Sequence, residues 1–442
     1  MSEVAKRPLL DVLQPPISGS RPKGGVSTET DGVPSLGGEN ILSSGGVTYE
    51  VIKRITQSFF DSIPNGKLCG GDVLINKDGA QTGKVGYYIG DLFDEAAINE
   101  HLFILRGLSD DIIEQSYLYY ALLLPETQQE IERRITGSAQ PGLNSCFVKA
   151  VGIPYHPINV QKDIACILRT IDRAIEKTET LIAKYHKIKA GLMHDLFTRG
   201  VTADGKLRPP REQAPELYKE TPIGWIPKEW KCKTLEQLLA PVGNNLRSGP
   251  FGSALLKDEL VEEGIPFLGI DNIYTEHFEA RYRRFVSQKK FMELYRYSVR
   301  PKDIVITIMG TVGRCCILPD DIGQALSSKH LWTMTLDQSQ VFPELVCWQL
   351  NYAPWVLSWF RKESQGAVMD AIQSSTLRTL QLPVPRMSEQ DEILGKYLAS
   401  TSKIKSERSE LNKLKKKKAG LMHDLLTGRV RVLQNKIMEV TL

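Results

Sequence analysis

Polar, glycine-rich loops hold most of the side chains of this 442-residue chain that could take part in chemistry. Residues 76–84 include Lys77, Gln81 and Lys84 between two strand-like runs, and residues 309–314 include Thr311 and Arg314 in a similar setting. Glycine lets a backbone approach a phosphate closely, and Lys and Arg suit phosphate or guanine contacts. Loops of this kind, taken alone, are more often plain turns.

Further polar loops lie near the start and the end of each half of the chain. Asn, Gln, Arg and Lys are the side chains that read base edges through paired hydrogen bonds. The loops differ between the two halves, which favours two different recognised sequences. The candidate DNA-binding residues are Arg21, Lys23, Lys77, Gln81, Lys84, Gln140, Asn144, Asn244, Asn245, Arg247, Thr311, Arg314 and Gln373.

Catalytic motifs are absent from the sequence. It has no Asn/Asp-Pro-Pro-aromatic loop, no H-E-x-x-H and no G-x-S-x-G. Residues 79–85 resemble a P-loop, but the spacing is wrong and Val85 cannot ligate magnesium. Seven cysteines without a C-x-x-C pair indicate reduced thiols of a cytoplasmic protein. We therefore predict no catalytic residue, no metal site and no membrane span, and the net charge of +4 permits nucleic-acid binding without arguing for it.

A repeated sequence organises the elements that must position these loops. Residues 190–196 and 419–425 both read Ala-Gly-Leu-Met-His-Asp-Leu. At the same spacing, Gln161 matches Gln390 and the pair 153–154 matches 382–383. A long identity at a fixed offset indicates tandem copies of one module. Small shifts in the offset further upstream indicate changes in loop length between the copies.

Each copy is predicted to contain an α+β recognition domain followed by a long helix. Short apolar runs bounded by Gly, Asn and Asp predict strands, and proline-bounded runs predict helices. Trp225 and Trp230 are expected to hold the connector between the copies against a surface. The predicted boundaries are 1–158 for the first domain, 159–198 for the first long helix, 199–231 for the linker, 232–387 for the second domain, 388–428 for the second long helix and 429–442 for the tail.

Both long helices carry apolar residues at alternating spacings of four and three, which is a heptad pattern. We expect the two stripes to pack on each other as an antiparallel coiled coil; the alternative is that each helix packs alone on its own domain. Polar residues interrupt the stripes at Thr178 and Glu407 and at Lys189 and Lys418. The predicted coiled-coil residues are Ile164, Leu168, Ile171, Ile175, Ile182, Tyr185, Leu192, Ile393, Tyr397, Ile404, Leu411, Leu414 and Leu421.

The chain resembles the specificity subunit of type I restriction–modification enzymes. The resemblance rests on the stretches 137–143 and 366–372, the turns at 153–154 and 382–385, the Gly224-Trp225-Ile226-Pro227 entry to the second copy, and the heptad helices with their repeated ends. It implies that each domain reads one half of a bipartite, asymmetric DNA site. The paired helices would then set the spacer and dock methyltransferase subunits.

The resemblance also implies the composition of the whole complex. Two modification subunits would use S-adenosylmethionine, two motor–nuclease subunits would use ATP and Mg²⁺, and this chain would bind double-stranded DNA without a cofactor of its own. Two alternatives stay open. One is the specificity subunit of a two-subunit restriction system that cuts on both sides of its site. The other is a structural adaptor that does not read DNA.

Overall fold

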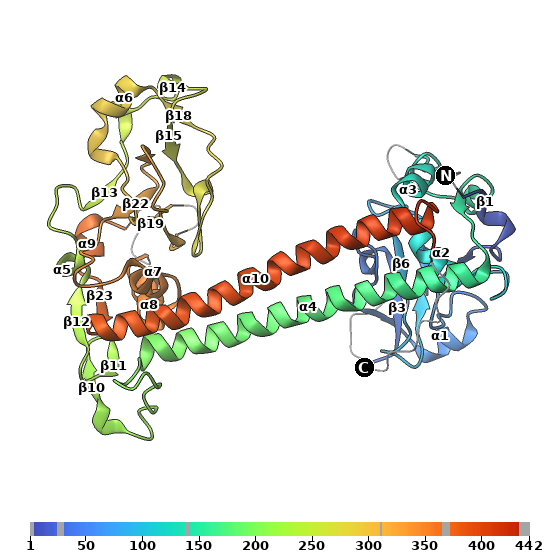
Figure 1. The fold of residues 1–442 in the computed structure, drawn as a ribbon, viewed down its shortest axis with the longest axis horizontal. Coiled ribbons are helices and arrows are strands. Elements are labelled where there is room, and N and C mark those ends of the chain that lie inside the picture. Colours follow the sequence, from blue (N-terminus) through green and yellow to red (C-terminus); the bar gives the residue numbers. More distant parts are fainter. Residues whose placement is uncertain (1–3, 24–30, 138–140, 310–311, 365–371, 433–442) are drawn as a thin grey trace. The chain divides into compact units, whose positions relative to one another are not determined.

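The computed structural model describes residues 4–23, 31–137, 141–309, 312–364 and 372–432 (Figure 1). The chain divides into two compact units. The first contains Met1–Leu181 with Glu407–Leu442, and the second contains Ile182–Ser406. The division passes through both long helices, so each unit holds one globular domain and a part of each helix.

The globular domain of the first unit is built on three small sheets. A four-stranded antiparallel sheet has the order β2 (Ile17–Ser18), β8 (Leu102–Leu105), β5 (Val73–Asn76), β6 (Val85–Tyr87). A second sheet places β3 (Val33–Leu36) antiparallel to β4 (Lys53–Ile55) and parallel to β7 (Ala97–Ile98). The third pairs β1 (Lys6–Pro8) with β9 (Gly152–Pro154).

The second unit repeats these three sheets in the same strand order, with one more strand in the mixed sheet and an added pair of β16 (Ile273–Tyr274) and β17 (His277–Phe278). Its antiparallel sheet runs β13 (Leu246–Ser248), β22 (Leu331–Met334), β19 (Ile304–Thr307), β20 (Cys315–Ile317). Its mixed sheet runs β14 (Leu260–Val261), β18 (Phe285–Val286), β15 (Ile265–Leu268), β21 (Leu326–Ser327), with β15 parallel to β21. The strand β12 (Lys231–Thr234) pairs with β23 (Gln381–Val384), as β1 pairs with β9. The prediction of one fold used twice is confirmed.

The helices of the two domains also correspond. In the first unit, α1 (Gln57–Ser62) begins at the N-cap Thr56, and the matching α6 (Gln288–Glu293) begins at Ser287; each cap hydroxyl accepts a backbone N–H. Proline starts α3 (Pro125–Glu132), α7 (Pro343–Tyr352) and α8 (Pro354–Ser364), where its missing N–H costs nothing. The remaining short helices are α2 (Gln115–Leu122), α5 (Leu235–Leu238) and α9 (Ser374–Arg378).

Two buried amides hold equivalent joints in both copies. Gln161 donates to the carbonyls of Ile112 and His156, and its own oxygen accepts from the N–H of Glu114. Gln390 makes the same three kinds of bond in the second copy. Both side chains are almost fully buried, so each satisfies backbone groups that would otherwise be costly to bury. These two residues therefore fix the start of each long helix against its domain.

The long helices α4 (Ile158–Thr198) and α10 (Met387–Leu426) lie against each other inside each unit (Figure 1). In the first unit, Lys418 pairs with Asp172 and Lys415 with Glu179. In the second, Lys403 lies over the ring of Tyr185. Numbers rise along one helix as they fall along the other, so the pairing is antiparallel, as predicted.

Burial along the helices follows the predicted heptad stripe. Ile164, Leu168 and Ile393 are at most 1% exposed, and Ile171, Ile182 and Ile404 are also buried. The other predicted stripe residues are half-buried, while most positions between them are exposed. The ends of the stripes belong to the hydrophobic cores of the domains. Ile164 and Leu168 share a core with Leu425 in the first unit. Leu196 shares a core with Ile393 in the second unit.

The two lysines in the stripes are neutralised by different partners. Lys418 Nζ lies 2.6 Å from Asp172, which also accepts a hydrogen bond from the Tyr120 hydroxyl. Lys189 Nζ lies 3.4 Å from Glu276 and 4.6 Å from the centroid of the Tyr397 ring. A charge in a mostly apolar seam needs such a partner, so these pairs fix which residues face each other.

The connector between the copies is more ordered than the extended linker expected from its composition. Strands β10 (Tyr218–Thr221) and β11 (Gly224–Pro227) form a hairpin. Trp230 is buried in the core of the second unit, as predicted. Trp225 is instead 46% exposed, and the guanidinium of Arg211 lies 4.9 Å from its ring centroid.

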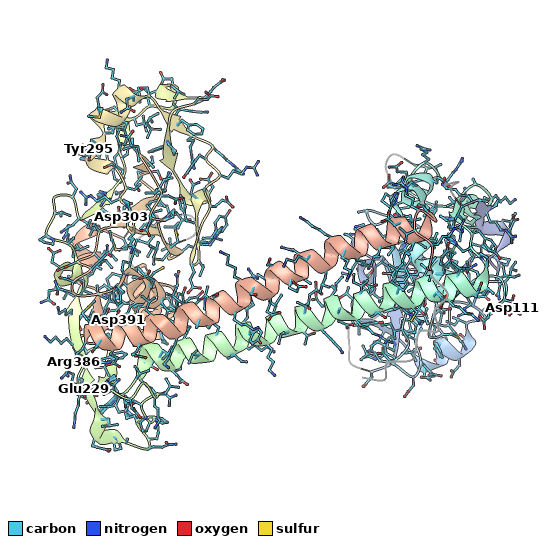
Figure 2. All side chains as sticks on the ribbon, in the orientation of Figure 1. Asp111, Glu229, Tyr295, Asp303, Arg386 and Asp391 are labelled. Atoms are coloured by element: carbon cyan, nitrogen blue, oxygen red, sulfur yellow. The ribbon has the colours of Figure 1, made fainter. Side chains whose placement is uncertain are left out.

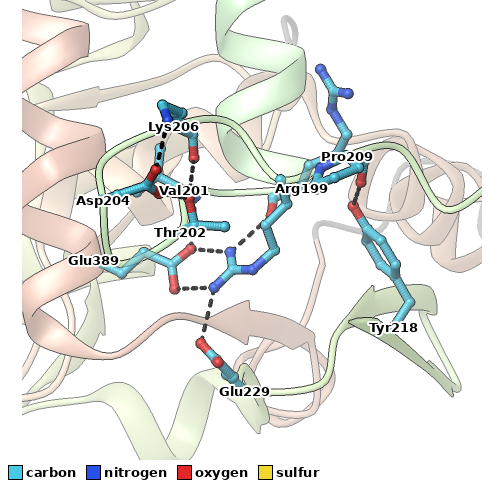
Figure 3. Close-up of polar contacts among 10 residues, drawn as sticks. Arg199, Val201, Thr202, Asp204, Lys206, Pro209, Tyr218, Glu229 and Glu389 are labelled. Atoms are coloured by element: carbon cyan, nitrogen blue, oxygen red, sulfur yellow. Dashed lines mark hydrogen bonds and ion pairs between the residues drawn. The ribbon is translucent and has the colours of Figure 1, made fainter. Parts of the chain in front are cut away.

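A buried ion pair ties this connector to the start of α10 (Figure 3). The Arg208 guanidinium donates to both oxygens of Glu389, to Glu229 and to the carbonyl of Arg199. The side chains of Arg208 and Glu389 are both under 10% exposed. The Glu389 carboxylate also accepts the backbone N–H of Val201. The connector is thereby held where it leaves α4.

Candidate nucleic-acid interface

In the first unit, a cavity of about 250 Å³ lies beside the turn between β5 and β6. Gly38 and Glu39 line it from the segment after β3, Asn76 from the end of β5, Gln81 from the turn, and His101 from the residue before β8. A Cβ on Gly38 would lie 2.8 Å from the Asn76 amide, so glycine is needed for this close approach. The sheet thus brings three segments distant in sequence to one polar site.

The turn that carries Gln81 is held by its own hydrogen bonds. Thr82 Oγ1 donates to the carbonyl of Gly79 at 2.6 Å, and Gly83 donates to the carbonyl of Asn76 at 2.7 Å. Gly79 and Gly83 have φ of 81° and 87°, which suits glycine. The neighbouring loop adds a bond from Leu143 N–H to the Lys77 carbonyl. A fixed turn presents its side chains with little ordering cost on binding.

Charged groups surround the cavity. Asp78 Oδ1 lies 2.5 Å from His101 Nδ1, and Glu39 lies 2.6 Å from Lys53 Nζ. Burial alone would raise the pKa of Glu39, but the hydrogen bond and charge of Lys53 outweigh it, so the pKa is lowered. The Glu39 carboxylate therefore stays ionised at neutral pH. The side chains that line the cavity are mainly hydrogen-bond acceptors.

The equivalent place in the second unit has different chemistry. Thr307 replaces Asn76 and Met309 replaces Asp78, while His330 stands where His101 does. His330 Nδ1 contacts the Met309 sulfur at 3.2 Å, and burial lowers its pKa, with help from Lys329. Asp271 pairs with Arg284 in place of Glu39 with Lys53. One scaffold thus presents two unlike polar surfaces.

Five of the predicted basic residues lie on loops of the two domains. Lys84 Nζ donates to Ser43 Oγ at 2.7 Å, and Arg21 pairs with Glu100 at 3.3 Å. Lys77 lies 5.3 Å from the Phe103 ring centroid, and Arg314 lies 5.6 Å from that of Tyr274. Lys23 is exposed. These exposed or half-buried cations stay predictions for DNA contact.

Three other candidates have structural roles in the domains. Arg247 is 5% exposed and donates to Asp303, Thr335 and the carbonyls of Asn244 and Ser298. Asn245 donates to the carbonyl of Ala240 and accepts from Arg378. Asn144 caps a short 3-10 turn by accepting from the N–H of Cys146. Because these polar groups already have protein partners, we no longer expect Arg247, Asn245 or Asn144 to read bases.

The remaining candidates are exposed or undescribed. Asn244 is exposed with φ of 54°, a left-handed conformation that Asn tolerates. Gln373 is exposed ahead of α9 and its side chain makes no capping bond. Gln140 and Thr311 lie outside the described residues. Asn244 and Gln373 therefore stay candidates on geometric grounds.

The structure adds an exposed basic segment that the loop patterns did not single out. Arg281 and Arg283 are exposed ahead of β18, next to Arg284, which pairs with Asp271. Within the described residues no ion pair is recorded for either side chain. Three arginines interleaved with Tyr282 and Phe285 are a pattern typical of nucleic-acid contact, and that sequence signal could have found them.

Among the described residues, no group of three or more His, Cys, Asp or Glu side chains could hold a metal ion. Within the same residues, no helix is both long and apolar enough to cross a bilayer. Cys315 and Cys347 are buried thiols with their sulfurs 3.7 Å apart.

Comparison with known proteins identifies the scaffold. The Type I restriction modification DNA specificity domain matches residues 1–184, which is the first copy and most of α4. The putative type I restriction enzyme MjaX specificity subunit of Methanocaldococcus jannaschii is 28% identical over 384 residues, covering 84% of this chain and 81% of that protein. The MjaVIII specificity subunit of the same organism is 24% identical, covering 82% and 79%. Residues 1–184 thus carry the type I restriction modification DNA specificity domain, and the chain is similar to type I specificity subunits over about four fifths of its length.

Solved structures share the fold of this chain. The S subunit of the type I restriction–modification system from M. genitalium matches with a TM-score of 0.56 and 16% identity, covering 96% of both chains. A chain from a type I restriction–modification complex matches with the same TM-score and covers 97% of this one. The match therefore extends over the second copy, which the sequence domain does not reach.

Proposed function

We propose that this specificity subunit reads a bipartite, asymmetric DNA sequence, each globular domain contacting one half. The observation that carries the proposal is the contrast between a repeated scaffold and unlike loops. The buried joints at Gln161 and Gln390 are the same, whereas Asp78 beside β5 is replaced by Met309 beside β19. Selection for packing alone would not require the exposed polar loops to diverge in this way.

The subunit itself is non-catalytic in this proposal. It would work on double-stranded DNA with two methyltransferase subunits that use S-adenosylmethionine and two motor–nuclease subunits that use ATP and Mg²⁺. Such a complex would act in the cytoplasm, where its DNA is found. Relatives that carry the name of type I enzymes favour this reading over a two-subunit system that cuts on both sides of its site. The same relatives count against an adaptor that does not read DNA.

Duplicate docking surfaces support two copies of one methyltransferase partner. In the second unit, a cavity of about 420 Å³ is lined by Ala190, Met193 and His194 with Trp348. In the first unit, a cavity of about 790 Å³ is lined by the repeat-related Ala419, Met422 and His423 with Tyr119. The identical heptapeptides each begin with two exposed residues, Ala190 and Gly191 in one and Ala419 and Gly420 in the other. Exposed residues that are the same in both copies suit binding to the same partner.

A domain exchange tests the proposed function. We expect that replacing residues 232–385 with the corresponding domain of another specificity subunit changes one half of the recognised site and keeps the other. The measurement is sequencing of modified bases in the genome of cells that carry the chimera and its methyltransferase partner. The reciprocal exchange of the first domain serves as the matched control. A chimera that alters both halves, or that directs no modification at a defined sequence, would contradict separate reading by each domain.

A further inference from the structure

We infer that the cavity beside Gln81 in the first domain is a base-reading pocket for an exocyclic amino group, that of adenine or cytosine. The inference rests on the proposed function and names the chemistry that this domain would read. It starts from two acceptors in the pocket that lack a protein donor. Asn76 Oδ1 and Gln81 Oε1 are both buried, and neither has a hydrogen-bond partner among the described residues.

Asn76 is the stronger of the two observations. Its side chain is 1% exposed, lines the cavity and ends β5, where the sheet fixes its backbone. An unsatisfied buried acceptor is unfavourable, and a native structure tolerates few of them. The absence of a protein donor at this position indicates that a ligand supplies one.

Gln81 lies across the same cavity on the hydrogen-bonded turn. Its residue is half-buried, so its amide can rotate about the terminal bond without any change in the backbone. A glutamine amide matches adenine well, because its oxygen accepts from N6 and its nitrogen donates to N7. Cytosine offers the N4 amino group, which carboxylates such as Asp78 accept.

The charge of the pocket excludes a phosphate as its occupant. Asp78 and Glu39 both contribute carboxylates; Lys53 Nζ pairs with Glu39, and the imidazole of His101 contacts Asp78. Glu100 adds another carboxylate 3.5 Å from His101 Nε2. An anionic oxygen would face these carboxylates with no lysine or arginine among the described residues that line the cavity, whereas an amino group finds acceptors there.

The second domain lacks this arrangement. Thr307 occupies the place of Asn76, and its hydroxyl accepts from the N–H of Arg314. Met309 offers no carboxylate, and its sulfur contacts His330. The amino-group preference is therefore assigned to the half-site read by the first domain only.

Base analogues test the pocket in the intact specificity subunit bound to its methyltransferase partner. Once the modified genomic sequence is known, duplexes are made with purine in place of each adenine, or 2-pyrimidinone in place of each cytosine. Both analogues lack the amino group and keep the ring. We expect one position in the half-site of the first domain to weaken binding by roughly tenfold or more. The identity of that base distinguishes adenine from cytosine.

Two variants assign that loss to Gln81. Gln81→Met removes the acceptor at similar size, so it should bind the natural and the analogue duplex equally. Gln81→Glu keeps an acceptor and should keep the preference for the amino group. Gln338→Met, at an exposed position of the second domain that is not a candidate for DNA contact, is the matched control and should leave the analogue penalty unchanged. All dissociation constants are measured at one salt concentration, since phosphate contacts depend strongly on salt.

The outcomes separate this inference from the proposed function. If natural duplexes bind with sequence preference but no analogue in the half-site of the first domain weakens binding, the pocket does not read an amino group. If Gln81→Met keeps the full penalty, Gln81 does not read the amino group and its assignment fails. If the complex binds all duplexes alike, the proposed function itself fails. A penalty that appears only in the half-site of the second domain would also overturn the assignment.

Discussion

At the scale of single residues, arginines that look alike in the sequence have opposite environments. Arg247 and Asp303 are both buried, and Asp303 is marked in Figure 2. Burial raises the pKa of Asp303 although the Arg247 guanidinium opposes the rise. Arg281 carries the same charge on an exposed segment. Removing one member of a buried ion pair lowers the free energy of unfolding more than removing an exposed charge does, because the other member stays buried without its counter-charge.

The first prediction concerns this pair. Arg247→Met should destabilise the second domain by about 3–5 kcal/mol, since Asp303 would stay buried without its cation. Arg281→Met should change stability by at most about 0.5 kcal/mol, as expected of an exposed site. Hydrogen exchange of peptides from β13, β19 and β22 measures both effects inside that domain. Equal protection in the two variants would show that the buried pair contributes nothing.

At the scale of elements, the long helices connect the two domains along the chain. Their seam is apolar at most heptad positions, and its two lysines have carboxylate partners on other elements. Each helix passes from one unit to the other, α4 after Leu181 and α10 after Ser406. This continuity suits the proposed role of the helices in setting the spacer.

A matched insertion tests that role. Four residues, about one helical turn, are added to α4 after Leu181 and to α10 after Ser406. The pairing on each side of the insertions should be kept, and the spacer between the two half-sites should lengthen. Sequencing of modified bases gives the new spacer. As a control, four residues added to the exposed 202–206 turn of the connector should leave the spacer unchanged. A spacer that stays the same after the helix insertions would rule out a measuring role for the helices.

At the scale of the whole molecule, duplication gives each unit the same heptapeptide, and we propose the exposed starts of the two heptapeptides as two equivalent docking surfaces. The exposed Ala190 and Ala419 begin identical heptapeptides, each beside a cavity of its own unit. The Lys residues just before them, Lys189 and Lys418, have different ion-pair partners, Glu276 and Asp172. The outward surface is thus kept the same while the inward contacts differ, which favours one kind of partner bound twice.

Partner counting checks this expectation. Ala190→Glu and Ala419→Glu each place a bulky charge on one surface, so each should lower the number of bound methyltransferase subunits from two to one. The double variant should bind none. Native mass spectrometry of the copurified complex measures the count. Ser409→Glu, at an exposed position of α10 ten residues before Ala419, should keep two. Two subunits retained in the double variant would place the docking surface elsewhere.

Local patterns accounted for most of the fold. The heptad spacing predicted which residues of α4 and α10 are buried, because a helical period repeats the same face without reference to the rest of the chain. The offset between the copies predicted that their topologies match. The β10–β11 hairpin was missed, since Pro, Gly and charge also typify extended connectors and only the packing of Trp230 and Arg208 gives this segment a fixed place.

The sequence by itself determined the duplication, the paired helices and the family, because these depend on periodic or repeated residue types. It could not rank the candidate DNA-binding residues. Arg247 and Arg314 are equally basic, and only the tertiary structure shows that one is surrounded by protein acceptors and the other lies beside Tyr274. Likewise, Asn76, Gln81 and His101 meet in one cavity only because β5 pairs with both β6 and β8. Such convergence depends on contacts between distant segments, which no local pattern records.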